Sequence, residues 1–402
     1  MTLPGAGALE GVGILDATLR EGEQAPGVYF EPHVKAAIAG LLDDIGVEVI
    51  EAGHPVVDAE ISRAVYSLSR RGFHARIAAH ARACRGDVEA ALASGAGFLG
   101  IFLCVSPERL RERGLTLAAA LDQVTGAIIL AKERQPGLIV RFTPEDAVRS
   151  PVADVATAAA AAAAAGADII SVADTTGCMI PGSRRSLYDW LSRFRDELQR
   201  RDARPRLAVH CHNDRGLALA NALDGLRAGA SLVDASVLGL GERAGIVDLA
   251  ALLAVLAQDF PGSGRWRLEK VAELYRLVSH FSGVPIPAHF PVMGRNAFRH
   301  CAGVHSQAAL RDPRHYQSLD PAPFGLSPEF SLDHMSGRAA LQHALEGIAA
   351  GDLDRELFSA VLNQVKAVGR KGRTVGSDEL GWIVAWERAQ AEGRPALLTQ
   401  SA

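Results

Sequence analysis

The stretch ILDATLREGEQAPGVYF (residues 14–30) begins with a short apolar run and changes abruptly to charged residues at Asp16. Arg20, Glu21 and Gln24 follow within nine residues of that acid. A strand that ends in so many polar groups leads either into a solvated turn or into one wall of a site. The pattern of the remaining chain distinguishes the two, because polar residues at the ends of several strands gather in one place in α/β folds.

The same pattern of a β-rich run followed by a helical one recurs along the chain. Apolar residues at i, i+3 and i+4 and a closing glycine are typical of the intervening helices. Eight such units favour a (β/α)8 TIM barrel. A doubly wound open sheet is the alternative, but no G-x-G-x-x-G follows the first strand. The predicted strands span residues 13–17, 47–53, 75–81, 98–105, 138–143, 168–175, 206–212 and 232–239.

Polar residues lie at or just after the ends of seven of these eight strands. In a TIM barrel the carboxyl ends of the strands carry the active site, so we expect these residues to share one opening. They are Asp16, Glu51, His54, His80, Arg82, Glu145, Asp146, Asp174, Thr175, His210, His212, Glu242 and Arg243.

The 402 residues divide into three predicted parts. Residues 1–12 have neither a basic nor an apolar region of a signal peptide and are expected to form a disordered lead. Residues 13–262 are expected to form the catalytic barrel. Residues 263–402 are expected to form a mostly helical C-terminal region.

The composition narrows the function classes. The net charge is −4 and no basic block occurs, which argues against a nucleic-acid or membrane-surface partner. The alanine-rich run near residue 160 is too short to span a bilayer, and alanine favours a helix there. Five dispersed cysteines without a C-x-x-C pair indicate reduced thiols in the cytoplasm.

The segment HCHND (residues 210–214) places two histidines on the same face of a strand, because side chains alternate with period two. Two imidazoles on one face suit a divalent metal, and Asp16 can supply a carboxylate from the first strand. The alternative is a structural histidine pair with Asn213 as a cap. Zn, Mn and Mg all fit such a ligand set.

Three further features suggest ligand contacts. Arg20 can stabilise a developing oxyanion, or it can simply form a salt bridge. His80 and Arg141 can bind an anionic tail as cationic or donor groups, or they are ordinary surface charges. The loop GLGERAG (residues 239–245) lets a ligand approach the backbone closely, or it is a plain turn.

In combination, the motifs DATLREGEQ, HCHND and GLGERAG resemble those of metalloenzymes that condense acetyl-CoA with 2-oxo acids, namely the homocitrate, 2-isopropylmalate and citramalate synthases. The resemblance covers about residues 13–320. It implies a TIM barrel, a divalent metal, acetyl-CoA as co-substrate and a homodimer. It also implies that the helical region reaches over the partner's barrel.

The resemblance also implies roles for individual residues. Asp16, His210 and His212 match metal ligands, and Glu21 would approach the same metal. Arg20 would stabilise the alkoxide, and Glu145 would take part in acid–base catalysis. His305 and Tyr316 would enter the neighbouring active site. Substrate-binding residues would be His80, Arg141, Thr143, Thr175 and Gln24, and the acetyl-CoA loop would contain Gly239, Gly241, Glu242 and Arg243.

The segments REGEQ (residues 20–24) and GVHSQAALRDPRHY (residues 303–316) resemble those of homocitrate synthases. This resemblance implies a 2-oxo acid with an anionic tail, most of all 2-oxoglutarate, which would give homocitrate. An apolar tail would leave the charge of Arg141 unpaired, which is costly. Ala208, His54 and the absence of an acid in the fourth strand depart from lysine-pathway homocitrate synthases. Condensation with a phosphonopyruvate-type acid, 2-isopropylmalate synthesis and metal-dependent C–C cleavage therefore remain as alternatives.

Overall fold

The computed structural model describes residues 11–260 and 265–393, which belong to two compact units, Met1–Ile286 and Pro287–Ala402. Most of the predicted disordered lead and the predicted boundary between residues 262 and 263 lie outside the described residues. The chain divides later than that boundary, because helix α10 (Val271–Ser282) packs against helix α1 (Pro32–Ile45) of the first unit.

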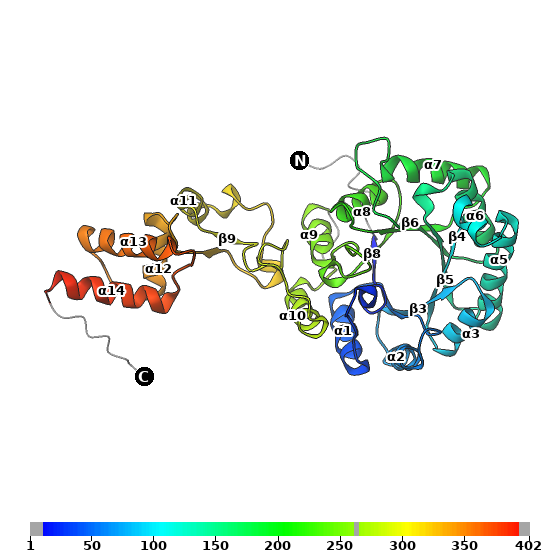
Figure 1. Cartoon of the computed structure of the whole chain (residues 1–402), viewed down its shortest axis with the longest axis horizontal. Helices are drawn as coiled ribbons and strands as arrows, with labels where there is room; N and C mark the ends of the chain where they lie inside the picture. The colour runs from blue at the N-terminus through cyan, green and yellow to red at the C-terminus, as the bar shows by residue number, and fades with distance from the viewer. Residues whose placement is uncertain (1–10, 261–264, 394–402) are drawn as a thin grey trace. The chain divides into compact units, whose positions relative to one another are not determined.

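The first unit is a closed barrel of eight parallel strands (Figure 1), as the sequence predicts. Each strand pairs with its sequence neighbours, and β1 closes the ring against β8. All eight predicted strands are present. They are β1 (Gly13–Asp16), β2 (Val49–Gly53), β3 (Arg76–Arg82), β4 (Phe98–Cys104), β5 (Ile139–Glu145), β6 (Ile169–Asp174), β7 (Arg206–Cys211) and β8 (Leu232–Ala235).

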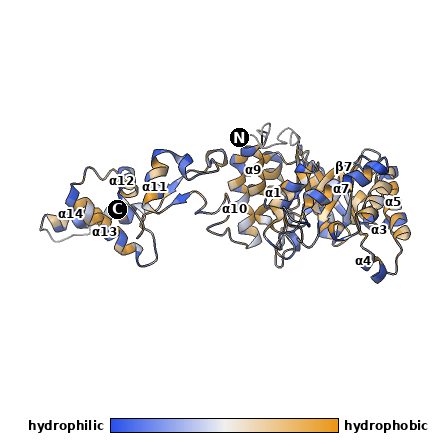
Figure 2. Ribbon diagram, turned by 90° about the horizontal axis from the view of Figure 1, so that it is seen from above, coloured by the Kyte–Doolittle hydropathy of each residue, from blue (hydrophilic) through white to orange (hydrophobic). Residues whose placement is uncertain are grey.

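Helices follow the strands and surround the barrel. Hydrophobic and hydrophilic residues alternate along these helices in Figure 2, because one face of each packs on the sheet. Among the described residues, no helix combines the length and apolar character needed to cross a membrane. The remaining helices of this unit are α2 (Ala59–Ser69), α3 (Arg85–Ala93), α4 (Pro107–Glu112), α5 (Leu117–Arg134), α6 (Val152–Ala164), α7 (Leu187–Arg200), α8 (Ala218–Arg227) and α9 (Leu249–Asp259).

The barrel interior is layered. An apolar layer includes Leu15, Val49, Ala78, Phe98, Ala208 and Leu232. Side chains two positions later along a strand point to the same face. Hence Glu51, His80, His210 and Asp234 lie one layer nearer the carboxyl ends, and all four are buried. The barrel thus has an apolar floor with charged and polar groups directly above it.

The second unit has a core of its own. Leu341, Phe358, Val361, Val365 and Leu380 are buried together there. The helices of this unit are α11 (Gly303–Arg311), α12 (Arg338–Gly347), α13 (Arg355–Gly369) and α14 (Ser377–Ala391), and two short strands, β9 (Arg299–His300) and β10 (Glu329–Phe330), pair in parallel. The prediction of a mostly helical C-terminal region is confirmed.

One buried tyrosine joins α10 to the barrel. The Tyr275 hydroxyl donates to Asp248 Oδ2 at 2.6 Å and accepts from the backbone N–H of Ala250 at 2.7 Å. Asp248 also caps α9 by accepting from the N–H of Ala251. Burial raises the pKa of Asp248 to about 6. The contact therefore satisfies the buried N–H of Ala250 and an oxygen of the partly buried Asp248 carboxylate.

We predict that Tyr275→Phe lowers the free energy of unfolding by about 2 kcal/mol, because it leaves a partly buried carboxylate oxygen and a buried N–H unpaired. Tyr66→Phe is the matched control, because Tyr66 is 45% exposed, and we expect it to change stability by less than about 0.5 kcal/mol. Urea titrations of both variants measure the difference. Equal losses would contradict the importance of this contact.

Candidate active site

The carboxyl ends of the barrel strands surround a cavity of about 190 Å³. Its position agrees with the general location of TIM-barrel active sites. Phe102, Ala173 and Asp234 line it without a predicted place there, and His54 lines it as a strand-end residue that was expected at the opening but had no assigned role. The predicted residues that line it are Arg20, Glu21, Gln24, His80, Arg141, Thr143, Glu145, Thr175, His210, His212 and Glu242.

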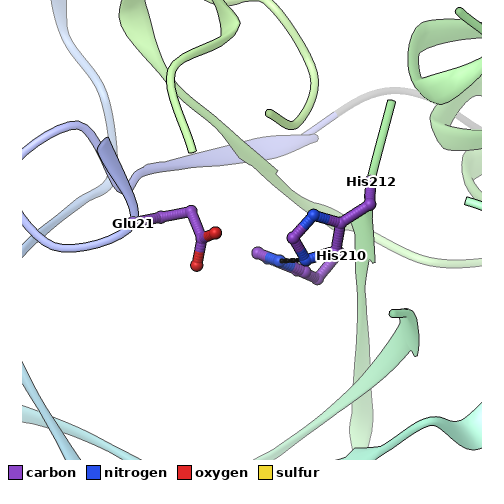
Figure 3. A group of neighbouring side chains, drawn as sticks. All are labelled: Glu21, His210 and His212. Atoms are coloured by element: carbon purple, nitrogen blue, oxygen red, sulfur yellow. Dashed lines mark hydrogen bonds between the residues drawn. The ribbon is translucent and has the colours of Figure 1, made fainter. Parts of the chain in front are cut away.

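Three of these residues form a cluster suited to a metal ion. The carboxylate of Glu21 points toward the two imidazoles of His210 and His212 (Figure 3), and one potential ligand atom from each lies within 4.8 Å of the others. The two Nε2 atoms are 3.3 Å apart. One carboxylate and two imidazoles leave coordination positions open for a substrate, as catalytic metal sites require.

The protonation states of Glu21 and His212 also favour a cation. Burial and the neighbouring His210 lower the pKa of His212 to about 4, so its imidazole is neutral at neutral pH. Burial opposes ionisation of Glu21, but Arg20 and His210 outweigh it and hold its pKa below the ordinary value. Neutral imidazoles and an ionised carboxylate are the forms that bind metal. The residues therefore fit a divalent ion.

The structure does not place Asp16 in this cluster, contrary to the prediction that it is a ligand. Leu15 and Ala17 both belong to the apolar cluster inside the barrel, so the alternation of side chains directs Asp16 away from the interior. Its Oδ1 accepts from the N–H of Thr18. Burial raises its pKa to about 7. Glu21 takes the place expected for Asp16, because the turn after β1 brings the chain back over the opening.

A chain of buried ion pairs begins at Arg20. Its guanidinium contacts Glu21 and lies 2.6 Å from Glu51. Glu51 in turn accepts from Arg141 Nη2 at 3.1 Å. Burial opposes ionisation of Glu51, but Arg20 and Arg141 hold its pKa well below the usual range. Glu51 is therefore a charged link between the two arginines.

The chain continues to the histidine cluster. Arg141 Nη1 donates to both carboxylate oxygens of Asp234, at 2.8 and 2.9 Å. Oδ2 of Asp234 also lies 3.0 Å from His210 Nδ1. A carboxylate only accepts, so Nδ1 carries the proton and Nε2 is left free to bind a metal. Asp234 thus orients one candidate ligand.

These contacts change the interpretation of His80 and Arg141. Arg141 is 1% exposed and its charge is already neutralised by Glu51 and Asp234. An apolar substrate tail would therefore not leave Arg141 unpaired, and that reason for an anionic tail was wrong. Burial and the charges of Arg20 and Arg141 lower the pKa of His80 well below its ordinary value. His80 is a neutral donor here.

The predicted threonines are arranged as ligand contacts. Thr175 Oγ1 accepts from the N–H of Asp146 at 2.9 Å, which leaves its own hydroxyl proton free to donate. Thr143 Oγ1 is buried without a hydrogen-bond partner. Glu145 is partly exposed, and Arg109 Nη2 lies 3.8 Å from it. Glu145 lines the cavity and Arg109 does not, so the carboxylate remains accessible from the cavity.

The loop that contains Gly239, Gly241, Glu242 and Arg243 packs on Glu21. The N–H of Glu242 donates to Glu21 Oε1 at 3.1 Å, and a Cβ at Gly241 would lie 3.1 Å from Glu21 Cγ. Arg243 pairs with Asp214 and also donates to the carbonyl of Thr175. The loop therefore positions the Glu21 carboxylate, and its predicted contact with acetyl-CoA stays a prediction.

Gln24 and a buried lysine that the sequence analysis missed support the same turn. The Gln24 amide nitrogen, when oriented to donate, lies 2.8 Å from Glu21. Lys35 is 2% exposed, and its Nζ donates to the carbonyl of Leu19 and to Glu23 at 2.6 Å. The sequence signal that could have identified Lys35 is its position on the face of α1 that is buried.

His305 and Tyr316 belong to the second unit. Their ring centroids lie 4.2 Å apart, so the predicted catalytic pair is at least adjacent. The structure gives the positions of both residues within the second unit. Their entry into a partner's active site stays a prediction.

Comparison with known proteins first identifies the broad class of protein to which the chain belongs. Residues 11–278 match the HMGL-like family model, and the chain belongs to this family of TIM-barrel proteins. The Bacillus subtilis HMG-CoA lyase structure aligns with a TM-score of 0.60 at 21% identity, over 74% of this chain and 98% of that one. At that identity the likeness supports the fold alone.

Within this class the chain belongs to the homocitrate synthase family. Residues 292–373 match the model "Homocitrate synthase post-HMGL domain-like". A homocitrate synthase of Pyrococcus abyssi is 41% identical over 88% of this chain and 94% of that protein. One from Saccharolobus islandicus is 37% identical over 89% of this chain and 76% of that protein. The resemblance inferred from the motifs is confirmed.

We predict that Glu21→Gln greatly reduces bound divalent metal, because it removes the only carboxylate of the cluster. Asp16→Asn is the matched control, an acid-to-amide change four residues from Arg20 that should retain full metal occupancy. Elemental analysis of both purified variants after Mn²⁺ loading gives the answer. Loss of metal from Asp16→Asn with retention in Glu21→Gln would restore Asp16 as the ligand.

We predict that Asp234→Asn weakens metal affinity about 10- to 100-fold, because His210 loses the charged acceptor that fixes its orientation. The control is Asp224→Asn, which removes a carboxylate that pairs with Arg227 on the outer helix α8. Titration with Mn²⁺, followed by electron paramagnetic resonance, measures both affinities. Equal affinities in the two variants would contradict a role for Asp234 behind the ligand.

Proposed function

We propose that this chain is an acyltransferase that condenses acetyl-CoA with 2-oxoglutarate to give homocitrate. The observation that carries the proposal is the cluster of Glu21, His210 and His212 beside Arg20 in one cavity. The relatives named homocitrate synthase, which match most of the chain, support the choice of reaction.

The cluster would hold the divalent metal, which is Zn, Mn or Mg. When bound, the metal supplies Lewis-acid polarisation of the ketone and carboxylate of the 2-oxo acid. Arg20 lies next to Glu21 and would donate to the ketone oxygen as negative charge develops there. The neutral His80 and the free hydroxyls of Thr143 and Thr175 would orient the substrate.

Carbon–carbon bond formation requires removal of a proton from the acetyl methyl group. Glu145 lines the cavity and would serve as the acceptor. His305 and Tyr316 would assist proton transfer from the second unit of a partner chain, which implies a homodimer. The enolate then attacks the ketone carbon, and water cleaves the thioester to release CoA and homocitrate.

The glycine loop at Gly239 and Gly241 would admit acetyl-CoA. The five cysteines are all free, in agreement with our proposal that the enzyme works in the reducing cytoplasm. Neither a nucleic acid nor a membrane takes part in this proposal.

We predict release of free thiol when the purified protein is mixed with acetyl-CoA, Mn²⁺ or Mg²⁺ and 2-oxoglutarate, with one homocitrate formed per CoA. Chelation of the metal should abolish the activity. The panel includes 2-oxoisovalerate and phosphonopyruvate as competing acids and a reaction without any 2-oxo acid as the control. No thiol release with any acid would overturn the proposal, and higher kcat/KM with another acid would replace 2-oxoglutarate as the substrate.

A further inference from the structure

The two histidines of the metal cluster differ in what supports them. Asp234 Oδ2 lies 3.0 Å from His210 Nδ1 and orients that imidazole. The Nδ1 atom of His212 is buried, and no residue in the described part of the chain forms a hydrogen bond with it. Metal-binding histidines are usually oriented by an acceptor at the second ring nitrogen. Since no such acceptor holds the His212 ring within the described residues, its position depends on the backbone that carries it.

That backbone is held between the segments that follow β6 and β8. His212 forms an isolated antiparallel bridge with Ile246, and the N–H of Asn213 donates to the carbonyl of Gly245 at 2.9 Å. On the other side, the N–H of His212 donates to the carbonyl of Asp174, at the end of β6, at 3.2 Å. The place of the His212 ring is therefore set by how these three chain segments fit together.

One side chain joins all three segments. Arg243, in the loop after β8, donates to the two carboxylate oxygens of Asp214, from Nε at 2.8 Å and from Nη2 at 3.0 Å. Nη2 also donates to the carbonyl of Thr175, just after β6, at 2.7 Å. Asp214 lies two residues beyond His212. The flat, forked guanidinium suits a two-point contact of this kind, which a lysine ammonium does not reproduce.

The backbone is shaped to allow this contact. Arg243 has a φ of 58°, a conformation that residues other than glycine rarely adopt. Gly177, in the loop after β6, has no side chain to keep that loop away from Asp214. A Cβ at Gly177 would lie 2.9 Å from Asp214 Oδ2 and 2.9 Å from the carbonyl oxygen of His212. The loops after β6 and β7 can therefore close on each other beside Arg243.

Arg243 has little capacity left for a ligand. Nε and Nη2 are bound to Asp214 and Thr175, and Nη1 lies 3.7 Å from the Glu242 carboxylate. One guanidinium and two carboxylates give this group a net charge of −1. It does not offer a free positive charge to an anion. The contacts therefore assign Arg243 to linking the loops.

Two further groups of the site lie beside this link. Glu242, the residue before Arg243, donates its N–H to Glu21 Oε1 at 3.1 Å. Thr175, whose carbonyl accepts from Arg243, lines the cavity and has a hydroxyl proton free to donate. A displacement of Arg243 would therefore move Glu21, Thr175 and His212 together.

We propose that Arg243 is a positioning residue that acts through Asp214 and the carbonyl of Thr175. It fixes Glu21 and His212 for the divalent metal, and it fixes the Thr175 hydroxyl for the carboxylate of the 2-oxo acid. The part that concerns the 2-oxo acid rests on the proposed function, whereas the part that concerns the metal does not.

The test is Arg243→Gln, measured first by titration with Mn²⁺ followed by electron paramagnetic resonance. We expect the Mn²⁺ affinity to fall about 10- to 100-fold, as for other groups that hold metal ligands in place. We also expect KM for 2-oxoglutarate, at saturating Mn²⁺, to rise about tenfold, because the Thr175 hydroxyl no longer reaches a charged carboxylate. Asp214→Asn should weaken Mn²⁺ binding similarly, and the double variant should be no weaker than either single one.

The matched control is Arg206→Gln. Arg206 lies at the start of the same strand, β7, and contacts both carboxylate oxygens of Glu48, so it too joins separate segments by a two-point ion pair. Its side chain is 33% exposed, close to the 39% of Arg243. Because this pair lies at the opposite end of β7, its loss should change Mn²⁺ affinity and KM less than about twofold.

A second variant, Arg243→Gly, separates the side chain from the backbone. Glycine adopts the left-handed conformation at this position without strain, and the missing side chain leaves room beside Asp214. Millimolar guanidinium ion should restore part of the Mn²⁺ affinity of this variant, whereas the same concentration of ammonium should not. Failure of guanidinium to restore any affinity would contradict the role of the side chain.

The outcomes distinguish this inference from the proposed function. Wild-type Mn²⁺ affinity in Arg243→Gln, or equal losses in Arg243→Gln and Arg206→Gln, would overturn the role of Arg243 in the metal site. Additive losses in the double variant would overturn its action through Asp214. Weaker Mn²⁺ binding with an unchanged KM would overturn the role toward the 2-oxo acid. A wild type that releases no thiol, but whose Mn²⁺ affinity depends on Arg243, would overturn the proposed function and support the positioning role.

Discussion

The buried chain of ion pairs from Arg20 through Glu51, Arg141 and Asp234 to His210 is the constraint on which the rest of the site depends. It joins groups on both sides of the barrel opening. Burying so many charges is expensive unless each is paired, and removing one partner of a buried pair costs about 3–5 kcal/mol. Strand register and side-chain alternation must therefore bring all five residues to the same interior layers.

The sequence was sufficient to predict the fold and the place of the site. Eight strand–helix units and polar strand ends define a TIM barrel with one active face, because both features are local patterns. The pair of histidines followed from period-two spacing on β7. Of the two predicted ligand carboxylates, the structure brings Glu21 to the histidines through a turn, whereas Asp16 lies on the outer face of β1.

The partners of Arg141 were beyond the reach of sequence patterns. Asp234 lies 93 positions further along the chain and Glu51 lies 90 positions before it. Only the closure of the barrel brings these residues together. The same limit applies to the pairing of Arg243 with Asp214, 29 positions away. A charged residue at a strand end thus indicates a site, while its role depends on which opposite charges the fold places beside it.

A crystal structure of the protein loaded with Mn²⁺, with an anomalous difference map at the manganese absorption edge, tests the central claim most directly. We expect a single strong peak about 2.0–2.3 Å from a Glu21 carboxylate oxygen and from the Nε2 atoms of His210 and His212. Asp234 should remain hydrogen-bonded to His210 behind it. A peak on Asp16, or no peak among the two histidines, would contradict the assignment of this cluster as the metal centre.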